Sequence, residues 1–336
     1  MHLRKGETVK KVFPWTIKQF PVGAVIMGNH PFPDQTDTIE KTLAYRQELE
    51  PIIPADSKFK PCMTCYLTDH TTPEEVVRGY REGVWCAVKL YMADQNGEGG
   101  TTGSHHGVKN LQGRYPVIAA MEKEQIPFLG HFEAVEDDVD EFDREIVSLE
   151  RDLVPMLRAF PGLKVVFEHI TDGRAADFVA QTEHQVRATV TCHHLMLNRN
   201  ALFRGGMNPD HWCKPVVKRE SHRRKVRQYV TSGNRRFGAG TDSAPHDEVA
   251  KSQPCGCPAG MLTEPIASEL YTTIFDEDGR LEHLENFLAV NFLDWYRVQP
   301  SPETMTMERK PSTGPQKVGE FRVFGKGMEL SWTRAA

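Results

Sequence analysis

The regular alternation of short apolar runs with helix-forming segments is the feature that most limits how this chain can fold. Runs typical of buried strands, bounded by glycine- or proline-rich turns, occur at residues 23–27, 60–67, 84–91, 126–131, 163–169, 186–191 and 237–242. Helical patterns lie between them at 38–50, 73–82, 113–123, up to about 160, 173–181 and 219–230. Strands joined through helices form parallel sheets, because a parallel pair needs a long crossover connection.

With a first strand shortened at Met1, the pattern predicts eight strands and therefore a (β/α)8 barrel of the α/β class, rather than an open sheet. A length of 336 residues suits one such barrel with insertions. We expect a single domain over residues 1–336, because no linker divides the chain. From about residue 300, segments 321–324 and 328–332 are expected to form a short hairpin, as a C-terminal extension packed on the barrel.

Composition and charge limit the possible partners. The formal net charge of -5 argues against a nucleic-acid binder, which would be basic. A basic run at 218–225 is interpreted as a solvated helix face. The apolar runs are too short to span a bilayer. Seven cysteines without a signal peptide indicate reduced thiols in the cytoplasm. We therefore expect a small-molecule substrate and no nucleic acid or membrane partner.

Polar side chains gather where the predicted strands end, which in a barrel is the active-site end. The ends carry Asn29, Lys89, His131, His169, the pair at 193–194 and Asp242. Nitrogen and oxygen donors of this kind indicate a hydrolytic metal site rather than a structural zinc. An ammonium cannot bind a metal, and holding Lys89 neutral at pH 7 would cost about 4.6 kcal/mol. A carbamate formed on Lys89 would instead supply two anionic oxygens; an ion pair between Lys89 and an acid is the alternative.

Several segments together resemble one known family. They are His-Leu-Arg at 2–4, Val-Lys-Leu-Tyr at 88–91, the run at 165–171 that contains Glu-His, and Gly-Thr-Asp-Ser-Ala-Pro-His at 240–246, with further matches at 63–69, 193–195, 213–215 and 255–257. In these segments the chain resembles dihydroorotase, the short monofunctional type of the amidohydrolase superfamily. The resemblance covers the whole chain and implies a metal-dependent barrel hydrolase.

The resemblance implies two zinc ions per chain, bridged by a carboxylated Lys89. His131 and His169 would hold one ion, and His2 and Asp242 the other. Asp242 would also be the catalytic residue that carries the proton. The implied reaction is the reversible interconversion of N-carbamoyl-L-aspartate and L-dihydroorotate in pyrimidine biosynthesis.

The same resemblance implies a substrate site and an assembly. Arg4, Asn29 and His246 would bind the substrate carboxylate, which suits an arginine fork. The main chain near Lys214 and Pro258 would contact the pyrimidine ring. A mobile loop containing Thr101 and Thr102 would close over the substrate, and the family commonly forms homodimers.

The chain departs from the family pattern at three kinds of position. The family motif is His-x-His-x-Arg, and Met1 stands at the middle x, so the first histidine has no counterpart. Either the start was assigned one residue late, or one metal site is weakened. Gly28 stands where proline is usual, Phe132 stands where glycine is usual, and the loop at 92–107 is longer. The alternatives are a hydantoinase- or allantoinase-type hydrolase, which would not need three carboxylate partners, and a catalytically impaired homologue.

Overall fold

Seven parallel strands form the centre of the protein. The computed structural model describes residues 1–94, 104–253, 255–300 and 304–335. Neighbouring strands are consecutive in the sequence, from β1 to β7, and every pair is parallel. The strands are β1 (Gly23–Ile26), β2 (Lys60–Tyr66), β3 (Ala87–Tyr91), β4 (Phe128–His131), β5 (Val165–Phe167), β6 (Val186–Val190) and β7 (Phe237–Ala239).

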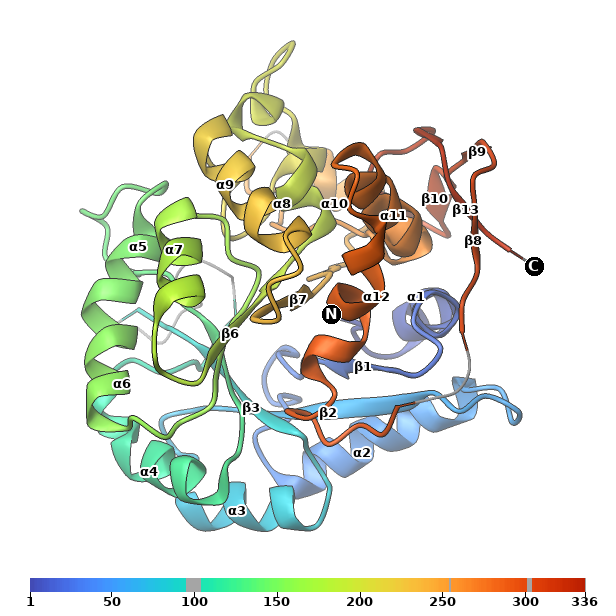
Figure 1. The fold of residues 1–336 in the computed structure, drawn as a ribbon. Coiled ribbons are helices and arrows are strands. Elements are labelled where there is room, and N and C mark those ends of the chain that lie inside the picture. Colours follow the sequence, from blue (N-terminus) through green and yellow to red (C-terminus); the bar gives the residue numbers. More distant parts are fainter. Residues whose placement is uncertain (95–103, 254, 301–303, 336) are drawn as a thin grey trace.

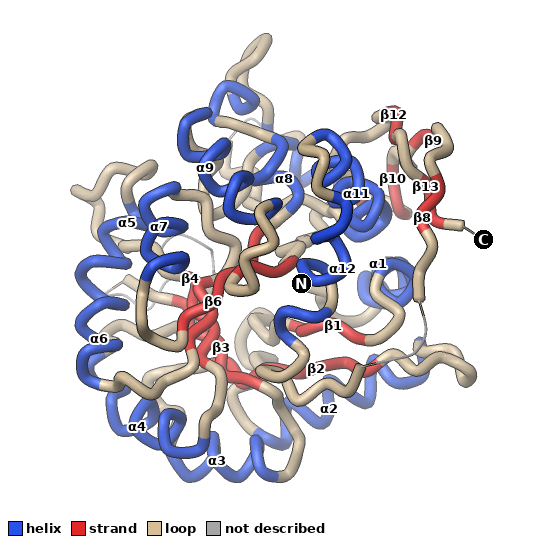
Figure 2. Tube along the Cα trace, in the orientation of Figure 1, coloured by secondary structure: helices blue, strands red, loops and turns tan. Residues whose placement is uncertain are grey.

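Helices surround this curled sheet, as Figures 1 and 2 show. The predicted helices are all present, although the one ending near residue 160 is divided by a π-helical segment before Pro155, which has no N–H to donate. The helices are α1 (Glu7–Gln19), α2 (Ile39–Leu49), α3 (Pro73–Arg81), α4 (Tyr115–Glu124), α5 (Arg144–Ser148), α6 (Val154–Ala159), α7 (Gly173–Gln181), α8 (Cys192–Met196), α9 (Glu220–Thr231), α10 (Glu248–Lys251), α11 (Ala267–Glu277) and α12 (Leu284–Leu288). The sequence predictions did not include α1, α8, α10, α11 or α12.

The predicted eighth strand at the N-terminus is not a strand, which corrects the strand count. Residues 1–4 nevertheless lie between the two edges of the sheet. Met27 N donates to Met1 O (3.0 Å), and His2 N donates to Ser243 O (2.9 Å). The Met1 amino group also donates to Val25 O of β1 (3.1 Å). This segment therefore closes the ring with two hydrogen bonds on the β1 side and one on the β7 side. It is too short to form a regular ladder on either side.

The barrel interior is filled from one end by a segment that follows α12. Phe292 and Trp295 pack in one buried cluster with Leu129 of β4 and Val166 of β5. Gly238 of β7 makes room for this plug, because a Cβ there would lie 2.3 Å from the Phe292 ring. Side chains on a strand alternate between faces, so Lys89, His131 and Glu168 lie on the same face as these plug contacts, one step further along their strands.

The C-terminal segment forms short two-stranded pairs, and the predicted hairpin between 321–324 and 328–332 is wrong. The antiparallel pairs are β10 (Lys317–Val318) with β11 (Phe321–Arg322), β12 (Glu329–Leu330) with β9 (Ser312–Thr313), and β13 (Thr333–Arg334) with β8 (Met307–Glu308). Val323 bridges to Leu262, so the segment contacts the chain between α10 and α11. Figure 1 shows these strands at the outer edge, away from the sheet.

Within the described residues, no helix is both long enough and apolar enough to cross a membrane.

Candidate active site

The side chains predicted from strand ends do converge at one end of the barrel. Lys89 lies within β3, two residues before its end, and His131 is the last residue of β4. His169 and Asp242 follow β5 and β7 by two and three residues. Asn29 follows β1 by three residues. The strands are thus shorter than predicted, but these residues remain at the carboxyl ends of the strands, where barrel active sites lie.

His131 and His169 form the first pair of donors. His131 Nδ1 and His169 Nε2 are 3.1 Å apart, and both side chains are buried. The other ring nitrogen of His131 lies 2.8 Å from Glu133 Oε2, which orients the ring. Burial lowers the pKa of His169 well below its ordinary value, against the opposing charge of Asp242, so its ring is neutral. A neutral imidazole is the form that binds a metal.

His2 and Asp242 form the second pair. His2 Nε2 lies 3.1 Å from Asp242 Oδ1, and its Nδ1 lies 2.6 Å from Asn29 Oδ1. Burial lowers the pKa of His2, while Asp242 opposes this shift. Burial alone would raise the pKa of Asp242, but His169 and then His2 hold it well below its usual range. Asp242 is therefore ionised at neutral pH and can accept a proton.

Lys89 is almost fully buried and pairs with an acid. Its Nζ contacts Glu168 Oε2 and lies 4.6 Å from the centre of the Tyr91 ring. An ion pair was the alternative that the sequence left open for this lysine. The sequence did not single out Glu168, although it directly precedes His169. An acid next to a strand-end histidine was the signal that could have identified it.

Three residues predicted for the site have a backbone conformation that non-glycine residues rarely adopt. The φ angles of Arg4, His169 and Asp242 are 64°, 43° and 44°, in the left-handed region. Non-glycine residues there are uncommon, and such strain concentrates at functional sites. This observation supports a functional role for the cluster independently of the side-chain chemistry.

Arg4 and His246 lie together beside the metal-ligand candidates. An Arg4 guanidinium nitrogen lies 3.4 Å from His246 Nε2, and the same His246 nitrogen lies 2.9 Å from Ala259 O. Burial, and then the Arg4 charge, lower the pKa of His246 to about 3, so it is neutral near pH 7. His246 also lines an open cavity of about 560 Å³, together with Lys251, Gly260 and Arg322.

The loops proposed to contact the substrate ring are held by a buried lysine that the sequence did not suggest. Lys251 Nζ donates to Trp212 O (3.2 Å), Pro258 O (3.1 Å) and Gly260 O (3.0 Å). Lys214 directs its side chain to Glu141. Lys251 therefore joins the segment preceding Lys214 to the segment containing Pro258. Thr101 and Thr102 lie outside the described residues.

Two of the departures from the family pattern have a packing explanation. Phe132 packs between Phe128 and Phe167, with ring centres 6.2 and 5.2 Å away, and is buried in the main core. Its ring therefore belongs to the core and does not narrow the site. Gly28 leaves space for Thr36, because a Cβ on Gly28 would lie 1.6 Å from Thr36 Oγ1.

The donor set fits a pair of metal ions. Each pair, His131 with His169 and His2 with Asp242, places two donors 3.1 Å apart. Two ligands of one zinc ion, at bond lengths of about 2.0–2.1 Å, lie about 3.3 Å apart in a tetrahedral arrangement. Among the described residues His169 Nδ1 has no hydrogen-bond partner, so it offers a further buried donor atom. The nitrogen and oxygen chemistry and the spacing both suit zinc.

Comparisons with known proteins give a consistent result, although no protein-family model matches the chain. A dihydroorotase from Methylobacillus flagellatus is 44% identical over 336 residues, covering 99% of this chain and 95% of that protein. A dihydroorotase from Sphingopyxis alaskensis is 43% identical over 332 residues, covering 99% and 95%.

Solved structures agree with these relatives. The Saccharomyces cerevisiae dihydroorotase, solved in complex with 5-fluoroorotic acid, matches with a TM-score of 0.89 and 27% identity, covering 100% of this chain and 95% of that one. An L-hydantoinase from Arthrobacter aurescens has a TM-score of 0.80 at 11% identity and covers 99% of this chain and 80% of that one, which shows a shared fold alone. With a parallel barrel, a convergent donor set and full-length relatives above 40% identity, the chain belongs to the dihydroorotase family of cyclic-amide hydrolases.

Proposed function

We propose that this protein interconverts L-dihydroorotate and N-carbamoyl-L-aspartate, as a zinc-dependent enzyme of pyrimidine synthesis. The observation that carries the proposal is the placement of two donor pairs, each 3.1 Å apart, beside Arg4 and His246. Donor pairs suit a hydrolytic metal centre, and the second group suits a substrate that carries a carboxylate.

The substrate carboxylate would bind to Arg4, Asn29 and His246. An arginine fork can donate two parallel hydrogen bonds to a carboxylate. Neutral His246 adds no second positive charge; its single N–H now donates from Nε2 to Ala259 O (2.9 Å), so substrate would exchange that bond for one of its own. The Asn29 amide now donates to Ser104 Oγ (2.9 Å), so substrate would exchange that bond for one of its own. The main chain of Lys214 and Pro258 would face the ring.

The amide chemistry would use the two donor pairs and Asp242. His131 and His169 would hold one zinc ion, and His2 and Asp242 the other, with Lys89 carrying CO2 as a bridging carbamate. Zinc at this position would acidify a water molecule and polarise the ring carbonyl. Asp242 would accept the proton of the attacking water and return it to the amide nitrogen as the ring opens. Formation of the carbamate requires Lys89 to leave its ion pair with Glu168 and to release two protons to solvent, because an ammonium cannot attack CO2 and the new N–C bond replaces an N–H bond.

The test is an ultraviolet assay of dihydroorotate ring opening with purified protein, combined with measurement of bound zinc. Turnover of dihydroorotate with at least two zinc ions per chain is expected. A 5-substituted hydantoin serves as the control substrate, because it has a similar ring but no carboxylate for Arg4. Faster turnover of the hydantoin would favour the hydantoinase alternative. Zinc-loaded protein with no turnover of either compound would favour a catalytically impaired homologue.

A further inference from the structure

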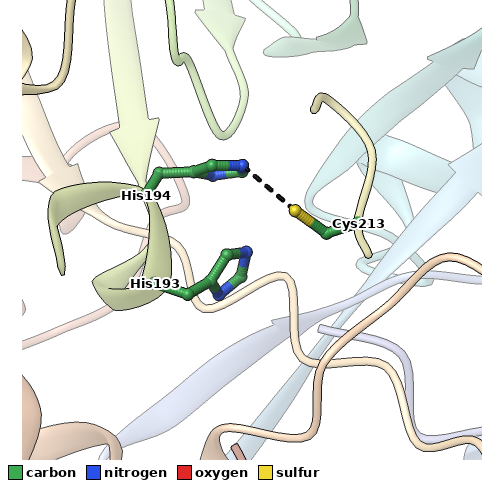
Figure 3. Close-up of side chains that lie close together, drawn as sticks. All are labelled: His193, His194 and Cys213. Carbon is green, nitrogen blue, oxygen red and sulfur yellow. Dashed lines mark hydrogen bonds between the residues drawn. The ribbon is translucent and has the colours of Figure 1, made fainter. Parts of the chain in front are cut away.

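A second group of metal-binding side chains lies near the proposed active site but shares no residue with it. His193 and His194 belong to α8, which begins where β6 ends, and Cys213 follows the short 3-10 helix Pro209–His211. One ligand atom of each lies within 4.8 Å of the others, and all three side chains are buried. Figure 3 shows the two imidazole rings and the Cys213 sulfur directed into one space.

Two members of this group already lie at the separation expected for ligands of one metal ion. His194 Nε2 and Cys213 Sγ are 3.4 Å apart. Two such ligands on tetrahedral zinc, with bonds of about 2.0–2.1 Å to nitrogen and about 2.3 Å to sulfur, lie about 3.6 Å apart. The other nitrogen of His194 lies 2.8 Å from Thr191 Oγ1, which fixes the ring. His194 Nε2 also lies 2.8 Å from Pro215 O, and Cys213 Sγ lies 3.4 Å from the same oxygen, so a bound ion would replace both of these contacts. Metal-binding histidines commonly have such a partner on the second nitrogen.

His193 supplies the independent observation. Its side chain is fully buried, and in the described part of the chain neither ring nitrogen has a hydrogen-bond partner. Burying an imidazole with both nitrogens unsatisfied is unfavourable, and native structures rarely contain such groups. A cation shared with His194 and Cys213 would satisfy one of these nitrogens.

Charges of both signs act on the three side chains. The carboxylate of Asp242 acts on all three side chains, and that of Glu133 acts on His194 and Cys213. Lys218 opposes the carboxylates at both His194 and Cys213, and Lys251 opposes them at Cys213. Two neutral imidazoles and one thiolate would carry a single negative charge, which a divalent cation more than balances.

We propose that His193, His194 and Cys213 bind a zinc-type divalent cation through two imidazole nitrogens and one thiolate. Three protein ligands leave a fourth position for water. Binding releases the Cys213 thiol proton to solvent, because the thiolate is the metal ligand. Cys213 is adjacent to Lys214, so the bound ion would also fix the segment proposed to face the substrate ring. The site itself does not depend on the proposed reaction.

The test is Co²⁺ spectroscopy on the full chain. The proposed active-site ligands contain no sulfur, so near-ultraviolet absorption from thiolate-bound Co²⁺ must come from a cysteine. This absorption is expected in the wild type and lost in Cys213→Ser. His193→Gln should weaken Co²⁺ binding at least tenfold, as measured by a Co²⁺ titration that follows this absorption. A Cys255→Ser, Cys257→Ser double variant is the control, since these are the more exposed thiols of the loop at 255–260, and should retain it.

Zinc content gives a second measurement. Wild-type protein should hold about one more zinc ion per chain than Cys213→Ser. If circular dichroism shows that Cys213→Ser is unfolded, His193→Gln decides the matter, because it removes no hydrogen bond among the described residues. The proposal fails if wild-type protein shows no thiolate absorption. It also fails if the absorption survives Cys213→Ser, or disappears only in the double variant.

Discussion

The buried ammonium of Lys251 should control both stability and substrate affinity, and Lys251→Met tests this. The substitution keeps the apolar stem but removes the three hydrogen bonds to Trp212 O, Pro258 O and Gly260 O. Lys251 is only 4% exposed, so burying its charge costs desolvation free energy, which the hydrogen bonds to these carbonyls offset. Burial lowers its pKa, as expected for an ammonium held by neutral oxygens.

The magnitude follows from these three bonds. A hydrogen bond to a charged group contributes about 1.5–3 kcal/mol, but neighbouring bonds do not add fully, and the removed charge no longer has to be buried. A net loss of about 3 kcal/mol in the free energy of unfolding is therefore expected. At about 2 °C per kcal/mol for a large domain, Tm should fall by about 6 °C. Release of the segment at 258–260 should raise KM about tenfold, which corresponds to about 1.4 kcal/mol of binding free energy.

The assay combines thermal unfolding with dihydroorotate kinetics, both with excess zinc so that metal loss does not contribute. KM should rise more than kcat falls, because the lost contacts bind substrate and transition state alike. Lys10→Met is the matched control, because Lys10 is exposed and pairs with Glu7 three residues away on the same helix. It should leave Tm and KM unchanged. If Lys251→Met matches this control in both measurements, Lys251 does not hold the substrate-facing loops.

Three further substitutions test the proposed site. Asp242→Ala should reduce kcat by at least about 10²-fold with unchanged circular dichroism, since it removes the proton carrier; normal turnover would exclude the proposed role. Arg4→Met should raise KM for dihydroorotate with a smaller effect on kcat, and an unchanged KM would remove Arg4 from the carboxylate site. His246→Gln should raise KM by the same factor at pH 6 and pH 8, because the lowered pKa of about 3 means that His246 gains a proton only far below this range. A factor that grows as pH falls toward 6 would show that the imidazolium binds substrate.

The sequence was sufficient to predict the end of the barrel at which the candidate site residues come together. Apolar runs and helical segments alternate, so parallel strands with outer helices are the arrangement that buries both. In that arrangement the carboxyl ends of the strands meet, and Lys89, His131, His169 and Asp242 had to come together near them. The starts of two helices could also be predicted from local sequence, because Thr72 and Asp172 each accept a hydrogen bond from the first turn of the helix that follows.

The strand pairing of the C-terminal tail could not be predicted from local sequence patterns. Its strands are two residues long, and such segments carry no periodicity that distinguishes one partner from another. The pairings of β8 to β13 depend on which surface of the barrel each segment reaches. For the same reason, local sequence did not predict the plug formed by Phe292 and Trp295, because its position inside the barrel depends on how the sheet closes.

Residue types and their spacing therefore determined the barrel, the end at which the candidate site lies and the kinds of donor in it. Tertiary structure alone decided which donors pair. His2 meets Asp242 across 240 residues, Lys89 meets Glu168, and Arg4, His169 and Asp242 take left-handed backbone conformations. The physical reason is that strand periodicity specifies only the face on which a side chain lies. Its partner across the barrel depends on how the sheet closes, and that is set by contacts between residues far apart in the chain.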